Sequence, residues 1–269
     1  MSPVPRVALS GATALVTGAT GGLGGAIAAA LAERGARLLV SGRREPELER
    51  VAQAVAGRAI VADLAVRHDV DQLAAEAAEA DIVVANAGLP ATGKLANLSR
   101  GDVDRILEVN LRVPIILAQA LAPGMAERGG GQLVFISSLA GKVTSPSSSM
   151  YSATKFGLRG FALALRQDLA RHNVGVSVVS PGFIRDVGMY HDAGARLPFG
   201  VGTRTADDVA RAVVRAIEED RAELEVASPQ LRLGAAVASL APGLAERASR
   251  RLGSHRVASE FASGQIDKR

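Results

Sequence analysis

A phenol and an ammonium stand four residues apart in Tyr151-Ser152-Ala153-Thr154-Lys155, a spacing that places both side chains on one face of a helix. A free phenol has a pKa of about 10 and is a poor base at neutral pH. Because a nearby ammonium favours the phenolate, we predict that Lys155 lowers the pKa of Tyr151 by about two to three units. Such a pair suits general acid–base work on an alcohol or carbonyl oxygen. For this pair taken alone, an exposed tyrosine beside a surface lysine is the alternative.

Other reactive groupings are poorly represented in the chain. There is no cysteine, which excludes disulfides, thiolate metal sites and cysteine nucleophiles. The histidines are scattered without metal-ligand spacing, so no metal site is expected; they are His68, His172, His191 and His255. The sequence has neither a G-x-S-x-G elbow nor a P-loop. A net charge of +4 is too small to indicate a nucleic-acid partner.

A glycine-rich segment, Thr17-Gly18-Ala19-Thr20-Gly21-Gly22-Leu23-Gly24, follows the first apolar run and precedes an alanine-rich helical pattern. Glycines at such a turn let backbone N–H groups approach a pyrophosphate, and the helix N-terminus adds partial positive charge. The spacing G-x-x-x-G-x-G differs from the commoner G-x-G-x-x-G fingerprint. We interpret the segment as a dinucleotide site, with an ordinary tight turn as the alternative.

The second apolar run ends at Val40-Ser41-Gly42-Arg43-Arg44. An acidic residue at this place would bind the adenosine 2′-hydroxyl and repel a 2′-phosphate. A charge-assisted bond from arginine to phosphate contributes about 1.5–3 kcal/mol, or roughly a 10- to 150-fold preference. Arg43 and Arg44 therefore predict NADP(H) in preference to NAD(H). The alternative is a pair of solvated arginines that opens the next helix.

Short apolar runs alternate with helical patterns along most of the chain. Strands are expected at residues 12–17, 36–41, 59–62, 82–85, 132–136, 175–179 and 223–226. Continuous aliphatic runs are typical of strands buried on both faces of a parallel sheet. The alternation predicts an α/β fold, a doubly wound Rossmann-type parallel sheet of about seven strands with helices on both faces. The length of 269 residues suits a single domain at residues 1–229 with a C-terminal extension.

In the order and spacing of its motifs, the sequence resembles the short-chain dehydrogenase/reductase superfamily over about residues 12–226. The resemblance implies that Asp63 and Leu64 contact adenine. It also implies that the segment after the fourth strand, Asn86-Ala87-Gly88, lies beside the cofactor and supports the sheet. The resemblance further implies that the segment after the sixth strand positions the nicotinamide through Pro181, Gly182 and Ile184.

The resemblance further implies a reaction. Nicotinamide would exchange a hydride with an alcohol or carbonyl carbon while Tyr151 exchanges a proton with the oxygen. Ser138, thirteen residues before Tyr151, would hold that oxygen, and its neighbour Ser137 is the less favoured choice. Lys155 would bind the nicotinamide ribose, and Asn110 would anchor a proton-relay water. A non-catalytic NADP(H)-binding regulatory or membrane-associated scaffold protein is the alternative function.

One position departs from the family pattern. Asp186 stands four residues beyond Gly182, where the family commonly has a threonine that bonds the nicotinamide carboxamide. A carboxylate can accept from the carboxamide NH₂ but cannot donate to its oxygen. Three interpretations stay open: the backbone around Ile184 positions the cofactor, cofactor affinity is lower than usual, or Asp186 faces solvent.

Two segments lie outside these motifs. Residues 185–204 predict a lid, whose apolar residues suit either an apolar substrate or lid packing; they are Met189, Tyr190, His191, Leu197 and Phe199. Residues 230–269 hold seven Lys/Arg and three Asp/Glu, a basic and partly amphipathic extension. We hypothesise that the extension lies weakly on an anionic membrane surface or covers a subunit interface. A helical hairpin packed on its own domain is the alternative.

The partners and location follow from the same observations. The resemblance implies a small carbonyl or alcohol substrate and a homodimer or homotetramer. The first ten residues have no apolar signal-peptide region, and no uninterrupted apolar run reaches about 18 residues. A cytoplasmic location is therefore expected.

Overall fold

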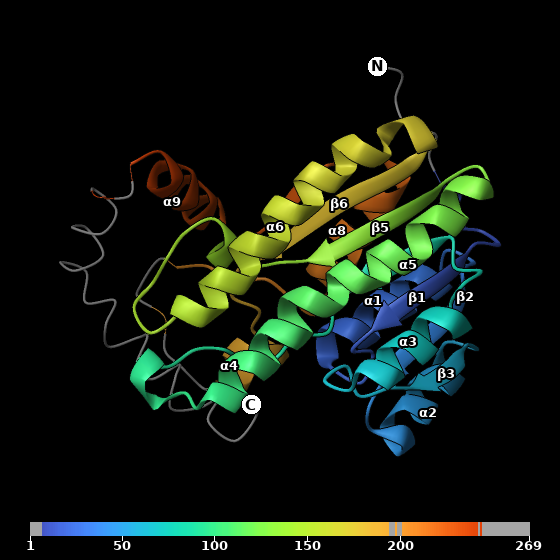
Figure 1. Ribbon diagram of the computed structural model, residues 1–269. Coiled ribbons are helices and arrows are strands. Elements are labelled where there is room, and N and C mark those ends of the chain that lie inside the picture. The colour runs from blue at the N-terminus through green and yellow to red at the C-terminus, as the bar shows by residue number, and fades with distance from the viewer. Residues whose placement is uncertain (1–6, 194–196, 198–200, 242, 244–269) are drawn as a thin grey trace.

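A parallel seven-stranded sheet forms the centre of the molecule, in the order β3-β2-β1-β4-β5-β6-β7 (Figure 1). The computed structural model describes residues 7–193, 197, 201–241 and 243. The strands are β1 Thr13–Thr17, β2 Arg37–Gly42, β3 Arg58–Val61, β4 Ile82–Ala85, β5 Gly131–Ile136, β6 Val174–Pro181 and β7 Glu223–Val226. The predicted doubly wound fold is confirmed, and each predicted strand lies within a few residues of an observed one.

Helices connect the strands and cover both faces of the sheet. They are α1 Gly22–Ala32, α2 Glu45–Ala54, α3 Arg67–Glu76, α4 Arg100–Leu107, α5 Val113–Glu127, α6 Ser149–Leu169, α7 Gly188–Ala193, α8 Ala206–Glu218 and α9 Pro229–Leu240. Shorter turns are η1 Leu95–Asn97, the π-helical η2 Glu108–Arg112, η3 Leu139–Gly141 and η4 Ala170–His172.

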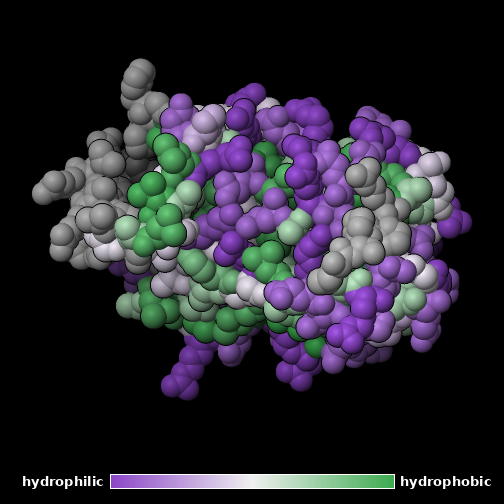
Figure 2. Space-filling model, turned by 90° about the horizontal axis from the view of Figure 1, so that it is seen from above, coloured by the Kyte–Doolittle hydropathy of each residue, from purple (hydrophilic) through white to green (hydrophobic). Residues whose placement is uncertain are grey.

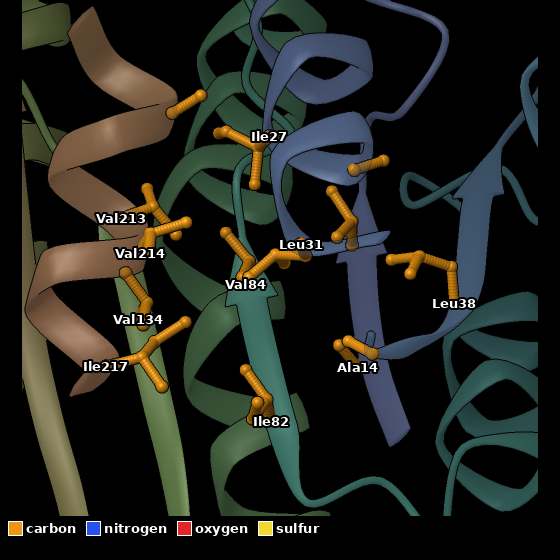
Figure 3. Packing of buried hydrophobic residues seen from close by; sticks show 14 of the residues in the cluster. Ala14, Ile27, Leu31, Leu38, Ile82, Val84, Val134, Val213, Val214 and Ile217 are labelled. Carbon is orange, nitrogen blue, oxygen red and sulfur yellow. The ribbon is translucent and has the colours of Figure 1, made fainter. Parts of the chain in front are cut away.

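Two hydrophobic cores lie on opposite faces of the sheet, because successive strand residues point to opposite sides. In β1, Ala14 and Val16 face the core under α1, α2 and α8, whereas Leu15 faces the core under α3, α5 and α6. Figure 3 shows Ile27 and Leu31 of α1 and neighbouring α8 side chains meeting over the centre of the sheet. The aliphatic strands are thus buried on both faces.

The stretch Arg100–Glu127, which runs from α4 through η2 into α5, is long and apolar enough by length and composition to cross a membrane. Half of its most apolar window is buried inside the fold. Val113, Leu117, Leu121 and Met125 belong to the core beneath α5, which accounts for the apolar composition of this helix.

The strand order reverses beside β1, which pairs with both β2 and β4. In doubly wound sheets the connections diverge at such a point and leave a crevice beyond the carboxyl ends of the strands, where ligands bind. The glycine-rich segment follows β1, and Asn86-Ala87-Gly88 follows β4. The topology therefore places two predicted cofactor segments at this crevice.

Candidate active site

The glycine-rich turn between β1 and α1 packs against the segment that follows β4. Gly18 has φ +67°, a left-handed conformation that favours glycine, and a Cβ built there would lie 2.8 Å from Ala87 Cα. A Cβ at Gly24 would lie 2.2 Å from the Gly18 carbonyl oxygen. No side chain caps the N-terminus of α1, which begins at Gly22. The backbone N–H groups of this terminus are therefore suited to a phosphate.

Asn86 joins the two segments by hydrogen bonds. Its Nδ2 donates to the carbonyl oxygens of Thr17, at 2.9 Å, and Gly18, at 3.3 Å. The Thr17 Oγ1 accepts from the backbone N–H groups of Asn86 and Ala87, each at 3.1 Å. The segment after β4 therefore supports the glycine turn, in the way the resemblance implies.

The ends of β2 and β3 lie where the resemblance implies the adenosine part of the cofactor. Arg44 Nη2 donates to the Thr20 carbonyl oxygen at 3.1 Å, which holds this exposed arginine over the glycine turn. Arg43 is exposed beside it. The Asp63 carboxylate accepts from the Ala65 N–H at 3.0 Å, and Leu64 is buried. The two arginines thus lie near the turn, where a 2′-phosphate is expected.

Tyr151 and Lys155 lie on α6, and Lys155 lies next to the segment after β4. Lys155 is 4% exposed, and its Nζ donates to the Ile136 carbonyl oxygen at 2.9 Å and lies 5.8 Å from the centre of the Tyr151 ring. A Cβ built at Gly88 would lie 3.6 Å from Asn110 Oδ1 and 3.8 Å from Lys155 Nζ. The fold therefore brings the tyrosine, the lysine and the asparagine together, although they are up to 45 residues apart.

The pKa values of Tyr151 and Lys155 differ from the prediction. Burial raises the pKa of Tyr151, and a hydrogen bond with Ser138 offsets part of this rise. Burial lowers the pKa of Lys155 to about 8. The prediction that Lys155 lowers the pKa of Tyr151 is therefore wrong for the protein chain alone. The physical reason is that burial disfavours the charged form of both groups.

Asn110 belongs to η2, the π-helical turn between α4 and α5. Its Oδ1 accepts from the Leu89 N–H at 2.6 Å, and its Nδ2 donates to the Leu89 carbonyl oxygen at 2.9 Å. The residue is 1% exposed. π-helical turns often occur at functional sites because they redirect side chains out of the regular helical pattern. Asn110 is thus fixed on the loop after β4, behind Lys155.

Ser138 begins η3, the short turn that follows β5. Its Oγ accepts from the Ala140 N–H at 3.1 Å, and its hydroxyl shares a hydrogen bond with Tyr151. The neighbouring Ser137 is buried, and its Oγ donates to the Lys155 carbonyl oxygen at 3.1 Å. The structure therefore brings Ser138, and not Ser137, to the phenol of Tyr151.

The segment after β6 closes the site from the other side. The Gly182 N–H donates to the Val226 carbonyl oxygen at 3.0 Å, and the buried Ile184 pairs in parallel with Arg204 at the base of the lid. The two Asp186 carboxylate oxygens lie 3.1 and 3.3 Å from the Ala206 nitrogen at the start of α8. Asp186 is exposed, as the third interpretation from the sequence had it, and its carboxylate also accepts from the Ala206 N–H and so stabilises the first turn of α8.

The described part of the lid contains α7. The rings of Phe183 and Tyr190 meet edge to face with centres 5.2 Å apart, and His191 Nδ1 lies 2.9 Å from the Arg185 carbonyl oxygen. Residues 194–196 and 198–200 of the predicted lid, including Phe199, lie outside the described residues.

Sequence reasoning missed two residues of the site, Gly141 and Val187. A Cβ at Gly141 would lie 2.7 Å from the Lys155 carbonyl oxygen, so this glycine lets η3 rest directly on α6. A Cβ at Gly22 would lie 2.4 Å from Val187 Cβ, so the start of the lid covers the cofactor turn. Neither contact has a sequence signal, because glycine is abundant in the chain and a lone valine carries no motif.

A glycine turn at the point where the strand order reverses, and a group of half-buried Tyr151 and Ser138 with buried Lys155 and Asn110, suit a nucleotide-dependent oxidoreductase. The short chain dehydrogenase family model matches residues 12–197, more than half of the chain. Ketoacyl reductase HetN of Nostoc sp. is 38% identical over 228 residues, which cover 81% of this chain and 79% of the relative. The chain belongs to the short-chain dehydrogenase/reductase superfamily and is an oxidoreductase of that family.

Other relatives agree with this assignment. 3-Oxoacyl-[acyl-carrier-protein] reductase FabG of Rickettsia conorii is 33% identical, over 66% of this chain and 74% of that protein. Actinorhodin polyketide ketoreductase with NADPH superposes with a TM-score of 0.73 at 28% identity, covering 81% of this chain and 96% of that one. A metagenomic short-chain oxidoreductase in complex with NADP superposes with a TM-score of 0.70 at 30% identity, covering 82% and 98%.

Proposed function

We propose that this enzyme is an NADP(H)-dependent reductase of a ketone or aldehyde carbon on a small, apolar substrate. The observation that carries the proposal is the proximity of Ser138 to Tyr151, where a hydrogen bond between the two offsets part of the rise in the pKa of the phenol, with Lys155 and Asn110 close by. The names of HetN and FabG make a 3-ketoacyl thioester the first substrate to test. Because these relatives are reductases, a non-catalytic scaffold role is not favoured.

The site residues divide the chemistry between them. The bound nicotinamide supplies the hydride, and the protein supplies the proton and the electrostatic stabilisation. Ser138 donates a hydrogen bond to the carbonyl oxygen and stabilises the negative charge that develops there. Tyr151 donates the proton. The raised pKa of Tyr151 keeps the phenol protonated at neutral pH, which suits the direction of reduction.

Behind the phenol, Lys155 and Asn110 complete the acid–base path. Lys155, whose pKa is lowered to about 8, is suited to proton exchange near neutral pH and to holding the nicotinamide ribose. Asn110 of η2 is held nearby by its hydrogen bonds to Leu89 of the loop after β4, and there it fixes a water that returns the proton from solvent.

The test of the proposed function is loss of NADPH absorbance with 3-ketoacyl thioesters, ketones, aldehydes and quinones. We expect turnover by the wild type and none by Tyr151→Phe, with NADPH binding unchanged in the variant. Full turnover by Tyr151→Phe would remove the phenol from the mechanism. Intact NADPH binding without turnover of any carbonyl in either direction would overturn the reductase proposal.

We also propose that Arg43 and Arg44 select NADP(H) by bonding the 2′-phosphate. The support is their position at the end of β2, with Arg44 held over the glycine turn by the Thr20 carbonyl oxygen. Arg43→Ala should weaken NADPH binding by roughly 10- to 150-fold and leave NADH binding nearly unchanged. Equal loss for the two cofactors would refute the phosphate role.

The C-terminal extension begins with α9, which packs one face on its own domain through Leu231 and Ala235. This arrangement supports the alternative of packing on the domain for the described part of the extension. The other face is apolar and exposed at Leu233, Val237 and Leu240. Figure 1 shows α9 at the left of the molecule, and Figure 2 shows hydrophobic surface gathered toward the left end of the molecule. Residues 244–269, which carry most of the basic charge, lie outside the described residues.

We propose that the exposed face of α9 contacts an anionic membrane surface weakly, with electrostatic help from the basic extension. The test is co-sedimentation of the full chain with vesicles containing phosphatidylglycerol, compared with a chain that lacks residues 234–269. Equal binding by the two chains would refute the membrane contact. Light scattering of the full chain tests the expected homodimer or homotetramer, and the cytoplasmic location stays a prediction.

A further inference from the structure

A carboxylate outside the predicted site connects the two segments that carry Ser138 and Tyr151. Glu223 begins β7, and its oxygens accept from Arg159 Nε at 2.7 Å and Nη2 at 3.0 Å. The same carboxylate lies 3.1 Å from Lys142 Nζ. The Glu223 side chain is 19% exposed, and that of Lys142 is 14% exposed. These charges are therefore shielded from solvent, where ion pairs hold their geometry better than on an open surface.

The two cations belong to different parts of the active site. Lys142 follows η3 directly, four residues after Ser138. Arg159 lies on α6, one helical turn after Lys155 and about two turns after Tyr151. Glu223 thus holds the serine segment with one oxygen while it binds the helix of the tyrosine through a two-point arginine contact.

Packing between the two segments makes their relative position sensitive to this carboxylate. η3 touches α6 at Gly141, where the Lys155 carbonyl oxygen leaves no room for a Cβ. A bidentate arginine–carboxylate pair fixes direction as well as distance. The hydrogen bonds from Arg159 and Lys142 keep the pKa of Glu223 below its ordinary value even though burial raises it. The carboxylate is therefore ionised in the pH range where the enzyme would work.

We propose that Glu223 is a positioning residue of the reductase reaction, which sets the distance between the Ser138 hydroxyl and the Tyr151 phenol through Lys142 and Arg159. The inference rests on the roles proposed above for Ser138 and Tyr151. Glu223 touches neither the substrate nor the cofactor in this arrangement. Its effect on the reaction is carried by the two segments that it joins.

A second set of contacts holds Lys142 in place from the side of α9. Glu225 lies 2.5 Å from Lys142 Nζ and 3.4 Å from Arg232 Nε of α9. Ser239 Oγ of α9 donates to the Lys142 carbonyl oxygen at 3.1 Å. Helix α9 is therefore attached to the segment that carries Ser138, and it restrains the same lysine that Glu223 binds.

The experiment is a double-mutant cycle in the full-length enzyme, with Glu223→Gln and Ser138→Ala. We expect Glu223→Gln to lower kcat by roughly 10- to 100-fold with little change in KM, because an error of about 1 Å in position can cost about 100-fold in rate. In the Ser138→Ala background the same change should lower kcat less than 3-fold, since no hydroxyl is left to misplace. Equal losses in the two backgrounds would overturn the proposal.

Glu219→Gln is the matched control. Glu219 also pairs with two arginines, Arg215 and Arg221, but it lies at the end of α8 and contacts neither η3 nor α6. We expect its kcat to equal that of the wild type. If Glu223→Gln fails to fold, Lys142→Gln replaces it in the cycle; this variant removes the ion pairs of Lys142 with Glu223 and Glu225 and leaves the Arg159–Glu223 pair intact. Lys142→Arg, which keeps the charge, should restore most of the activity.

Hydrogen exchange separates the positioning role from the proposed function. Peptides covering residues 137–143 and 151–160 should exchange faster in Glu223→Gln than in the wild type, with no change in Glu219→Gln. Unchanged exchange in these peptides would overturn the positioning role even if activity falls. If Ser138→Ala leaves kcat unaltered while exchange still responds to Glu223→Gln, the role proposed for Ser138 fails and the structural connection stands.

Discussion

Gly141 is the position where the smallest substitution should have a large effect on the reaction. A Cβ added there would lie 2.7 Å from the Lys155 carbonyl oxygen and 2.8 Å from Ser137 Oγ. Ordinary contact begins at 3.4 Å. In Gly141→Ala, η3 must therefore move away from α6 by about 0.7 Å, since the helix backbone cannot yield easily. Ser138 is at the start of η3 and should move with it.

The expected cost follows from this displacement. An error of about 1 Å in the position of a catalytic group can reduce the rate by about 100-fold. We therefore expect Gly141→Ala to lower kcat by roughly 10- to 100-fold. The affinity for NADPH should be nearly unchanged, because η3 packs mainly on α6 and β6, away from the glycine turn and the arginines after β2. Steady-state loss of NADPH absorbance gives kcat, and fluorescence titration gives the cofactor affinity.

Gly160→Ala provides the control on the same helix. Gly160 is exposed on α6, and a Cβ built there has no neighbour within 4 Å. Alanine in place of glycine inside a helix stabilises by about 0.5–1 kcal/mol, so this variant should melt slightly higher and keep the wild-type kcat. Wild-type kcat in Gly141→Ala, or an equal loss in both variants, would refute the argument that contact between η3 and α6 sets the position of Ser138.

Three further predictions concern stability. The pKa of Lys155 is about 8 in the folded protein and 10.5 in the unfolded chain. The unfolding free energy of the wild type, relative to that of Lys155→Met, should therefore rise by roughly 3 kcal/mol as the pH increases from 8 to 10.5. A difference that does not change with pH would contradict this. Asp186→Ala should lower the unfolding free energy by about 1 kcal/mol through loss of the bond at the start of α8, whereas Asp186→Asn should retain most of it in urea denaturation. Because the pKa of Glu223 is lowered from its ordinary value of 4.5, the ionised carboxylate stabilises the folded protein at pH values above 4.5, and this stability is lost as the pH falls. Glu223→Gln should therefore lower the unfolding free energy at neutral pH, and its difference from the wild type should shrink in acid.

The sequence by itself determined the fold and most of the residues at the site. Strand burial on both faces follows from aliphatic runs such as those of β1 and β2, because only a sheet covered on both sides can bury them. The glycine turn and the Tyr151–Lys155 pair are local patterns, in which the side chains that matter lie within one turn or one helix. The spacing of residues along the chain determines which side chains share one turn or one helix face, so these features could be predicted without coordinates.

Only the tertiary structure decided how distant segments meet. It directed the Ser137 hydroxyl to the Lys155 carbonyl oxygen, and it placed the Asp186 carboxylate on the backbone of α8. It also reversed the expected pKa shift of Tyr151, because burial is a property of the packed fold and not of a spacing of four residues. Glu223 lies 64 residues from Arg159, and nothing in the chain marks the two as partners. Contacts of this kind depend on strand order and helix packing, which the sequence determines only through the whole folded chain.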